Sequence, residues 1–259
     1  AVKTMPLAET KAVANELHKL RIAANHTNIV ALLADFVHDD TAYLVLELCH
    51  LGSVADLIAH DGGPGLDEHV ARAVCADAAA GLAHLHDSCA IAHRDVKAGN
   101  LLVCADGTTK LGDLGIAARL GSHGSGPVVG SPLWMAPEMI DRGVFDASVD
   151  VWALGITLLE MLEGQPPLAD SKPTVSAMFK IVSNPAPTLR EPSNWSDECA
   201  RFADACLRKE PAERLPAHQL ARTPWCAAAS REALLRRYRD GSTRHAAAAA
   251  VSDSAHHDE

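Results

Sequence analysis

The chain has 259 residues, 48% of them hydrophobic and 22% charged, so it is long enough to bury a core and too apolar to be disordered throughout. Its 33 acidic and 23 basic residues give a net charge of −10, which repels nucleic-acid phosphates and anionic lipids. No apolar run reaches the roughly 20 residues of a membrane-spanning helix. We therefore expect neither a nucleic-acid partner nor a membrane partner.

Seven cysteines are scattered along the chain and form no CxxC pair, which is the pattern of reduced thiols. We expect a cytoplasmic protein, with the nucleus as the alternative location. The first residues, AVKTMPLAETK, contain neither an initiator methionine nor the basic and apolar stretches of a secretory signal. This start predicts a fragment or a processed product.

The first part of the chain predicts helices around one hairpin. An amphipathic helix is expected over 11–24. Two apolar runs within 29–48, joined by the polar stretch 38–41, have the pattern of an antiparallel hairpin. A short helix over 53–60 follows the hairpin.

The remainder of the chain predicts a mainly helical region. A long helix is expected over 67–88, followed by short strands at 101–103 and 109–111. The segment 148–163 has no polar face, which indicates a helix at the centre of this region. Further helices are expected near 175–183, 196–208 and 216–222, before a disordered tail over 226–259.

Three motifs follow one another at characteristic distances: HRDVKAGNLL over 93–102, GDLG over 112–115 and APE over 136–138. Taken singly, Asp95 and Asp113 are ordinary turn residues. Together the motifs resemble those of eukaryotic-type protein kinases. The resemblance implies an α+β, bilobal protein kinase fold. A partial N-lobe with a small antiparallel sheet would occupy residues 1–48, and a helical C-lobe with the hinge, catalytic loop and activation segment would occupy residues 49–225.

The same resemblance implies a serine/threonine kinase that transfers the γ-phosphoryl group of Mg-ATP to protein hydroxyls. Asp95 would orient the substrate hydroxyl and accept its proton, and Lys97 would place a positive charge beside the transferring group. Asn100 and Asp113 would supply the oxygen ligands that Mg²⁺ prefers. Taken alone, Lys97 could be a solvated charge and Asn100 a helix cap; the combination of motifs favours the catalytic roles.

The ATP site is also implied by the resemblance. Lys3, in the strand that begins the chain, would bind phosphate, and Glu16 in the following helix would pair with it. Leu46 would be the gatekeeper residue. Glu47 and Cys49 would contact adenine through hinge backbone groups. Ser53 or Asp56 would contact the ribose, and Leu102 would form the floor of the adenine pocket.

Downstream, GSPLWMAPE over 130–138 resembles the peptide-binding end of an activation segment and contains Ser131. The resemblance implies that Glu138 pairs with Arg214 and that Asp150 holds the catalytic-loop backbone. His93 is interpreted as a buried structural histidine, and His84 and His86 as residues at a helix end. An apolar stack above Asp150 would contain Leu20, Leu32, His93 and Leu114.

The stretches LCHLGSVADLI and GITLLEMLEGQPPLAD narrow the resemblance to the sterile-20 group, and within it to the mammalian sterile-twenty-like (Hippo) kinases. Two departures matter: no glycine-rich loop precedes Lys3, and Pro127 stands where the family has its activating threonine. Ser122, Ser125 or Ser131 would have to substitute for that threonine. The alternatives are therefore a pseudokinase that acts as a scaffold, or a chain that does not fold. The expected partners are ATP, protein substrates and regulatory proteins.

Overall fold

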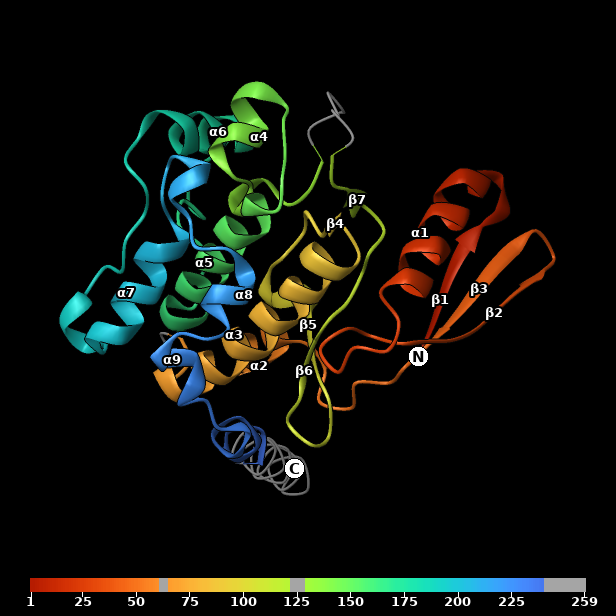
Figure 1. Ribbon diagram of the computed structural model, residues 1–259, viewed down its shortest axis with the longest axis horizontal. Coiled ribbons are helices and arrows are strands. Elements are labelled where there is room, and N and C mark those ends of the chain that lie inside the picture. The colour runs from red at the N-terminus through yellow and green to blue at the C-terminus, as the bar shows by residue number, and fades with distance from the viewer. Residues whose placement is uncertain (61–64, 122–128, 240–259) are drawn as a thin grey trace, which may run out of the picture.

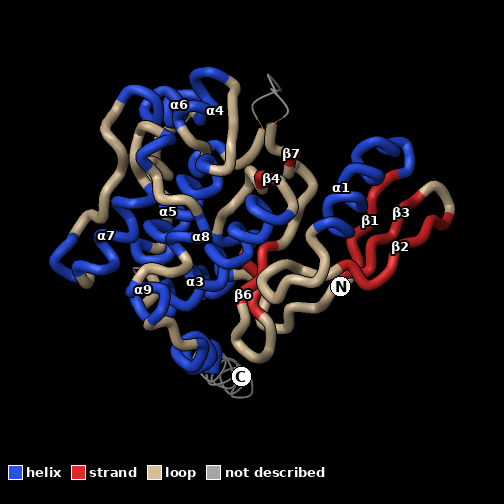
Figure 2. The backbone as a smooth tube through the Cα atoms, viewed as in Figure 1, coloured by secondary structure: helices blue, strands red, loops and turns tan. Residues whose placement is uncertain are grey.

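The computed structural model of the chain describes residues 1–60, 65–121 and 129–239, which form a small lobe and a large lobe (Figure 1). Strands gather in the small lobe and at its junction with the large one, whereas helices make up most of the large lobe (Figure 2). This arrangement confirms the expected α+β class. In the described residues, no helix is both long and apolar enough to span a membrane.

The small lobe is a three-stranded antiparallel sheet with one helix beside it. The strands lie in the order β1-β3-β2, and the elements are β1 (Val2–Pro6), α1 (Thr10–Ile22), β2 (Leu32–His38) and β3 (Thr41–Leu46). Lys3 on β1 lies opposite Leu44 on the central strand, and Leu44 is completely buried. The predicted helix and hairpin are both confirmed. Within the described residues β1 pairs with β3, and this backbone pairing positions Lys3.

The large lobe is built around α5 (Ser148–Glu163), in which 14 of 16 residues are buried. Gly155 lets the helix that ends at Cys206 approach closely, since a Cβ there would lie 2.7 Å from Cβ of Cys206. The predicted central position of this helix is therefore confirmed. The large lobe also contains α2 (Val54–His60), α3 (Glu68–Ala83), α4 (Pro137–Arg142), α6 (Thr174–Ser183), α7 (Asp197–Cys206), α8 (Ala217–Leu220) and α9 (Pro224–Ala227).

Two small ribbons lie where the lobes meet: β5 (Leu101–Val103) with β6 (Thr109–Leu111), and β4 (Ile91–Ala92) with β7 (Ala118–Arg119). They flank the segment 93–100 and the turn 112–117, so the two predicted motifs are held next to each other. Short helical turns lie between these elements: η1 (Leu7–Glu9), η2 (His84–Ser88), η3 (Ala98–Asn100), η4 (Pro132–Trp134), η5 (Pro192–Asn194) and η6 (Pro211–Glu213).

The start of the predicted tail is ordered, which corrects the expectation of disorder from residue 226 onward. Cys226 is buried, and residues 231–239 form a helix whose Leu234 is completely buried. Arg231 on this helix pairs with Asp77 of α3 at 3.1 Å. The Tyr238 hydroxyl donates to the carbonyl oxygen of Ser53 at 3.4 Å. A single buried leucine among arginines and alanines gives too weak a periodicity to predict the helix, and residues 240–259 lie outside the described part of the chain.

We expect Leu234→Ala to destabilise the protein by about 2–3 kcal/mol, because it leaves a cavity where the helix 231–239 packs on the large lobe. The melting temperature should fall by about 5–10 °C in a domain of this size. Thermal unfolding monitored by circular dichroism measures this. Glu232→Ala on the exposed side of the same helix is the control, and equal melting temperatures for the two variants would show that the helix does not dock.

Candidate active site

The segment between β4 and β5 brings Asp95, Lys97 and Asn100 together. Asp95 Oδ2 accepts hydrogen bonds from Lys97 Nζ at 2.9 Å and from Asn100 Nδ2 at 2.8 Å. Asp95 Oδ1 accepts one from the backbone nitrogen of Ser131 at 3.1 Å. The Ser131 hydroxyl in turn accepts from Lys97 Nζ at 2.6 Å. The residues predicted to carry catalysis thus form one cluster, and the expected activation-segment residue Ser131 is part of it.

The charge state of Asp95 follows from these contacts. Burial alone would raise the pKa of this carboxyl group, but the hydrogen bonds from Lys97, Ser131 and Asn100 and the positive charge of Lys97 bring it below its usual value. Asp95 is therefore ionised at neutral pH. An ionised, partly buried carboxylate can accept a proton from a hydroxyl group placed against it.

Asp113, in the turn after β6, faces the small lobe. Lys3 Nζ donates to Asp113 Oδ1 at 2.9 Å and to Glu16 Oε1 at 2.7 Å, so the three residues predicted for phosphate and metal binding are in direct contact. Burial opposes the charge of Lys3, yet the hydrogen bonds that it donates to both carboxylates leave its pKa above the usual value. Burial likewise opposes ionisation of Asp113, and the Lys3 ammonium nevertheless lowers the Asp113 pKa. Both groups are charged at neutral pH.

Asn100 and Asp113 could hold a magnesium ion. Asn100 directs its amide nitrogen at Asp95, which leaves the amide oxygen available as a metal ligand. The Asp113 carboxylate is half exposed, with 52% of the side chain accessible. No group of three or more histidine, cysteine or acidic side chains in the described residues is arranged as a complete metal cage. Two oxygen donors fit Mg²⁺, which keeps several waters and takes further oxygens from nucleotide phosphates.

The residues predicted for adenine and ribose lie along the connection between the lobes. Ser53 forms an isolated antiparallel bridge with Leu102 of β5. Asp56 Oδ2 accepts from both the Ser53 hydroxyl at 2.7 Å and the Ser53 backbone nitrogen at 2.9 Å, so the two candidates for the ribose contact form one unit. The Glu47 carboxylate is 3.0 Å from Lys110 Nζ. Burial, together with the neighbouring Cys104 thiol 3.7 Å away, raises the pKa of Cys49 to about 12.

Asp150 on α5 holds the backbone of the catalytic segment, as the resemblance implies. Its Oδ1 accepts from the Arg94 nitrogen and its Oδ2 from the His93 nitrogen, both at 2.7 Å. His86 Nε2 donates to the same Oδ2 at 2.7 Å. His86 is thus a partner of Asp150 as well as a residue of the turn η2. His93 is buried, and its Nε2 lies 2.9 Å from the carbonyl oxygen of Gly112, which links the catalytic segment to the turn of Asp113.

Glu160 is a residue of the site that the sequence did not single out. Its Oε2 accepts from the Ala98 nitrogen at 3.1 Å and from Trp134 Nε1 at 2.9 Å, which ties α5 to the catalytic segment and to η4. Burial raises the pKa of this carboxyl group. The sequence feature that indicates a role for Glu160 is its place inside an otherwise apolar helix, because a buried glutamate there needs polar partners.

Glu138 of α4 and Arg214 form the predicted pair, with two parallel contacts of 2.6 and 2.9 Å. Leu20, His93 and Leu114 of the predicted apolar stack are buried, and Leu32 is half-buried. Ser122, Ser125 and Pro127 lie outside the described residues.

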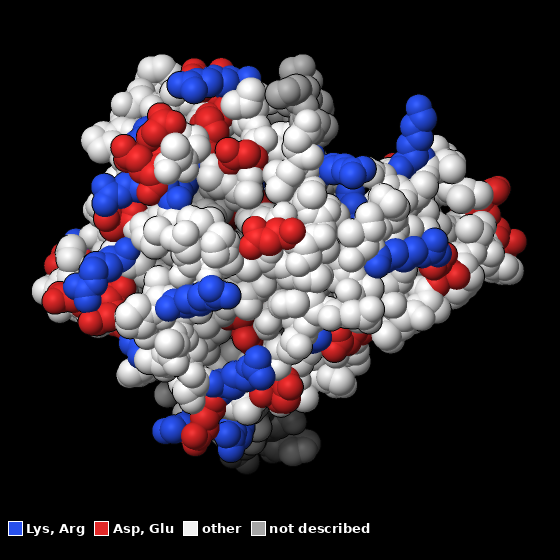
Figure 3. Space-filling model, viewed as in Figure 1, with Lys and Arg blue, Asp and Glu red and all other residues white. Residues whose placement is uncertain are grey.

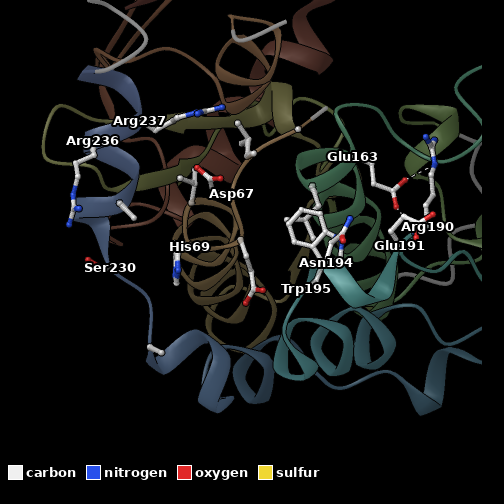
Figure 4. Close-up of a pocket in the computed structure, with 17 residues that line it drawn as sticks. Asp67, His69, Glu163, Arg190, Glu191, Asn194, Trp195, Ser230, Arg236 and Arg237 are labelled. Atoms are coloured by element: carbon white, nitrogen blue, oxygen red, sulfur yellow. Dashed lines mark hydrogen bonds and ion pairs between the residues drawn. The ribbon is translucent and has the colours of Figure 1, made fainter. Parts of the chain in front are cut away.

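A cavity of about 1130 Å³ lies elsewhere, between the N-terminal end of α3, the C-terminal end of α5 and the helix 231–239. Asp67, Trp195 and Arg190 contribute to its lining (Figure 4). None of the residues predicted for catalysis or nucleotide binding lines it. Despite its size, this cavity is therefore not the predicted catalytic site.

Comparison with known proteins agrees with this geometry. The family described as "Protein kinase domain" matches residues 1–226. The chain is 43% identical over 187 residues to "Serine/threonine-protein kinase cst-1" of Caenorhabditis elegans, covering 71% of this chain and 37% of that protein. It is 38% identical over 226 residues to "Serine/threonine-protein kinase 1" of Arabidopsis thaliana, covering 85% and 27%.

Mouse "Myosin-IIIa" is 41% identical over 209 residues, covering 75% of this chain and 13% of that protein. The chain thus spans less than two fifths of the length of each of these relatives. Similarity to cst-1, a kinase of the sterile-20 type, agrees with the group that the motifs predicted.

Proposed function

Because this chain belongs to the protein kinase family, we propose that it transfers the γ-phosphoryl group of Mg-ATP to serine and threonine hydroxyls of proteins. The observation that carries the proposal is the position of Asp95, held ionised between Lys97, Asn100 and the backbone nitrogen of Ser131. Phosphoryl transfer needs little covalent chemistry from the protein, and it depends on positioned groups and on charge.

Each residue of the cluster has a task in this reaction. Asp95 accepts a hydrogen bond from the substrate hydroxyl, orients it toward the phosphorus and takes its proton as the new bond forms. Lys97, already beside Asp95, stabilises negative charge on the transferring group. Asn100 and Asp113 would hold Mg²⁺, which supplies neutralisation of the phosphate charge when bound. Lys3, oriented by Glu16, binds phosphate oxygens.

The alternative is a kinase-fold scaffold without transfer activity, suggested by Pro127 at the position of the family's activating threonine. The complete set of catalytic and metal-binding side chains favours the enzyme.

We propose protein substrates and regulatory proteins as further partners, and a cytoplasmic or nuclear location. On the face shown in Figure 3, lysine and arginine side chains lie singly among acidic and uncharged ones, so this face offers no extended basic surface.

The test is an incorporation assay with γ-labelled ATP and a panel of peptides whose acceptor is serine, threonine or tyrosine. We expect label on serine and threonine peptides, and its complete loss when EDTA removes Mg²⁺. Label on tyrosine peptides would contradict the acceptor class. No label at any Mg²⁺ concentration, despite intact folding by circular dichroism, would favour the scaffold.

A further inference from the structure

Lys19 of α1 is a buried cation to which the proposed reaction assigns no task. It follows Glu16 by three residues, so both side chains lie on the same face of the helix, and only 5% of Lys19 is exposed. Its ammonium group donates to the carbonyl oxygens of Leu114, at 3.3 Å, and Gly115, at 3.1 Å. A buried ammonium is costly unless hydrogen-bonded, so these two contacts fix the side chain against the turn that contains Asp113.

Two cations hold three successive carbonyl groups of this turn. Lys19 binds those of Leu114 and Gly115, and Arg94 Nε donates to that of Ile116 at 2.8 Å. Burial and the nearby Arg94 charge lower the pKa of Lys19, while Glu16 and Asp113 act in the opposite direction. Asp113 itself has a φ of 54°, a left-handed conformation that costs energy in most residues. The backbone contacts from α1 and from the catalytic segment therefore support a turn that is not favoured by itself.

α1 reaches the turn in two different ways. One connection runs from Glu16 through Lys3 to the carboxylate of Asp113. In the proposed reaction the Lys3 ammonium binds phosphate and the Asp113 carboxylate binds metal, so both ligands compete with their direct contact. The other connection, from Lys19 to backbone carbonyls, uses neither group. It can therefore persist when nucleotide and metal are present.

We propose that Lys19 is a positioning residue that couples α1 to Asp113: its ammonium holds the Leu114–Gly115 backbone and thereby keeps the Asp113 carboxylate where it receives Mg²⁺. The inference rests on the proposed function. It predicts that the position of α1 controls metal binding through Lys19, separately from the effect of Glu16 on Lys3.

The test compares Lys19→Met, which keeps the length and the apolar stem but has no donor, with Lys19→Arg, which keeps a charged donor. Lys11→Met is the matched control, since Lys11 is exposed on the same helix. Binding of a fluorescent ATP analogue is titrated with Mg²⁺ and also measured without it. For Lys19→Met we expect the Mg²⁺ concentration at half-maximal binding to rise about tenfold, the effect of losing charged hydrogen bonds. Binding without Mg²⁺ should stay within about twofold of wild type.

Lys19→Arg should restore the Mg²⁺ requirement to near the wild-type value, and Lys11→Met should not change it. An unchanged requirement in Lys19→Met would overturn the inference, and so would equal losses with and without Mg²⁺, which indicate general damage. If Lys19→Met does not fold, Lys19→Gln replaces it; glutamine keeps a donor but loses the charge, so a smaller rise is expected, and an unchanged requirement would again overturn the inference.

A second measurement needs no nucleotide. The Gly115 amide donates to Asp113 Oδ1, and the Ala117 amide donates to the Leu114 carbonyl oxygen. Hydrogen exchange at both amides should be about tenfold faster in Lys19→Met than in wild type. Unchanged exchange would count against the inference. A wild-type protein that binds no nucleotide would contradict the proposed function instead, and the exchange experiment would still decide the role of Lys19 in holding the turn.

Discussion

Asp113→Asn should lower the rate of phosphoryl transfer by at least about a thousandfold, equivalent to about 4 kcal/mol of transition-state stabilisation. The substitution replaces an anionic oxygen ligand with a neutral amide of the same shape, and Mg²⁺ strongly prefers the carboxylate. Steady-state transfer from γ-labelled ATP at saturating Mg²⁺ measures the effect. A rate within tenfold of wild type would show that Asp113 does not hold the catalytic metal.

The same variant should melt within about 3 °C of wild type, because a half-exposed ion pair contributes only about 0–1 kcal/mol. Lys3 keeps Glu16 as a partner when Asp113 loses its charge. Asparagine is preferred to alanine here, because it tolerates the left-handed backbone of this position, at φ 54°. Asp35→Asn removes the charge of another exposed pair, with Arg21, and should leave the transfer rate unchanged.

Elements with a long hydrophobic repeat were predictable from the sequence, and very short ones were not. The core helix α5 has the bounds expected from its apolar run, 148–163. The helix expected over 67–88 is an α-helix from Glu68 to Ala83 and continues as the wider π-helical turn η2 to Ser88. The strands β4 and β7 have two residues each, too few to show any alternation. They form because the surrounding chain brings them together.

Some residues of the candidate site could likewise be predicted from the sequence, and others could not. Asp95, Asn100 and Asp113 lie in contiguous motifs, so their grouping could be predicted from the resemblance. Lys19 could not, because a charged residue on a helix is normally assigned to the solvent-exposed face, and for Glu160 the apolar helix around it indicates burial but not which partners it has. Their burial depends on partners that follow 95 residues later for Lys19 and precede by 62 residues for Glu160. No local pattern contains that information.

Glu138→Ala should destabilise the protein by about 3 kcal/mol, because it removes the anion from a buried pair. The Arg214 side chain is 0% exposed and contacts both Glu138 oxygens, so its guanidinium would remain charged and buried without a counter-ion. Contacts of Arg214 with the carbonyl oxygens of Arg208, at 2.8 Å, and Ser148, at 3.1 Å, hold it in place and prevent escape to solvent. For a domain of this size the expected fall in melting temperature is about 10 °C.

The position of the pair makes this loss informative about the site. Glu138 lies in the first turn of α4, which follows the segment that contains Ser131, and Arg214 also lies over the Trp152 ring of α5, at 5.0 Å. Glu198→Ala, which breaks an exposed pair with Arg201, should change the melting temperature by less than about 2 °C. The double variant Glu138→Met/Arg214→Met should be more stable than Glu138→Ala, because no unpaired charge stays buried. If Glu138→Ala and Glu198→Ala melt together, the buried pair does not anchor the end of the activation segment to the core.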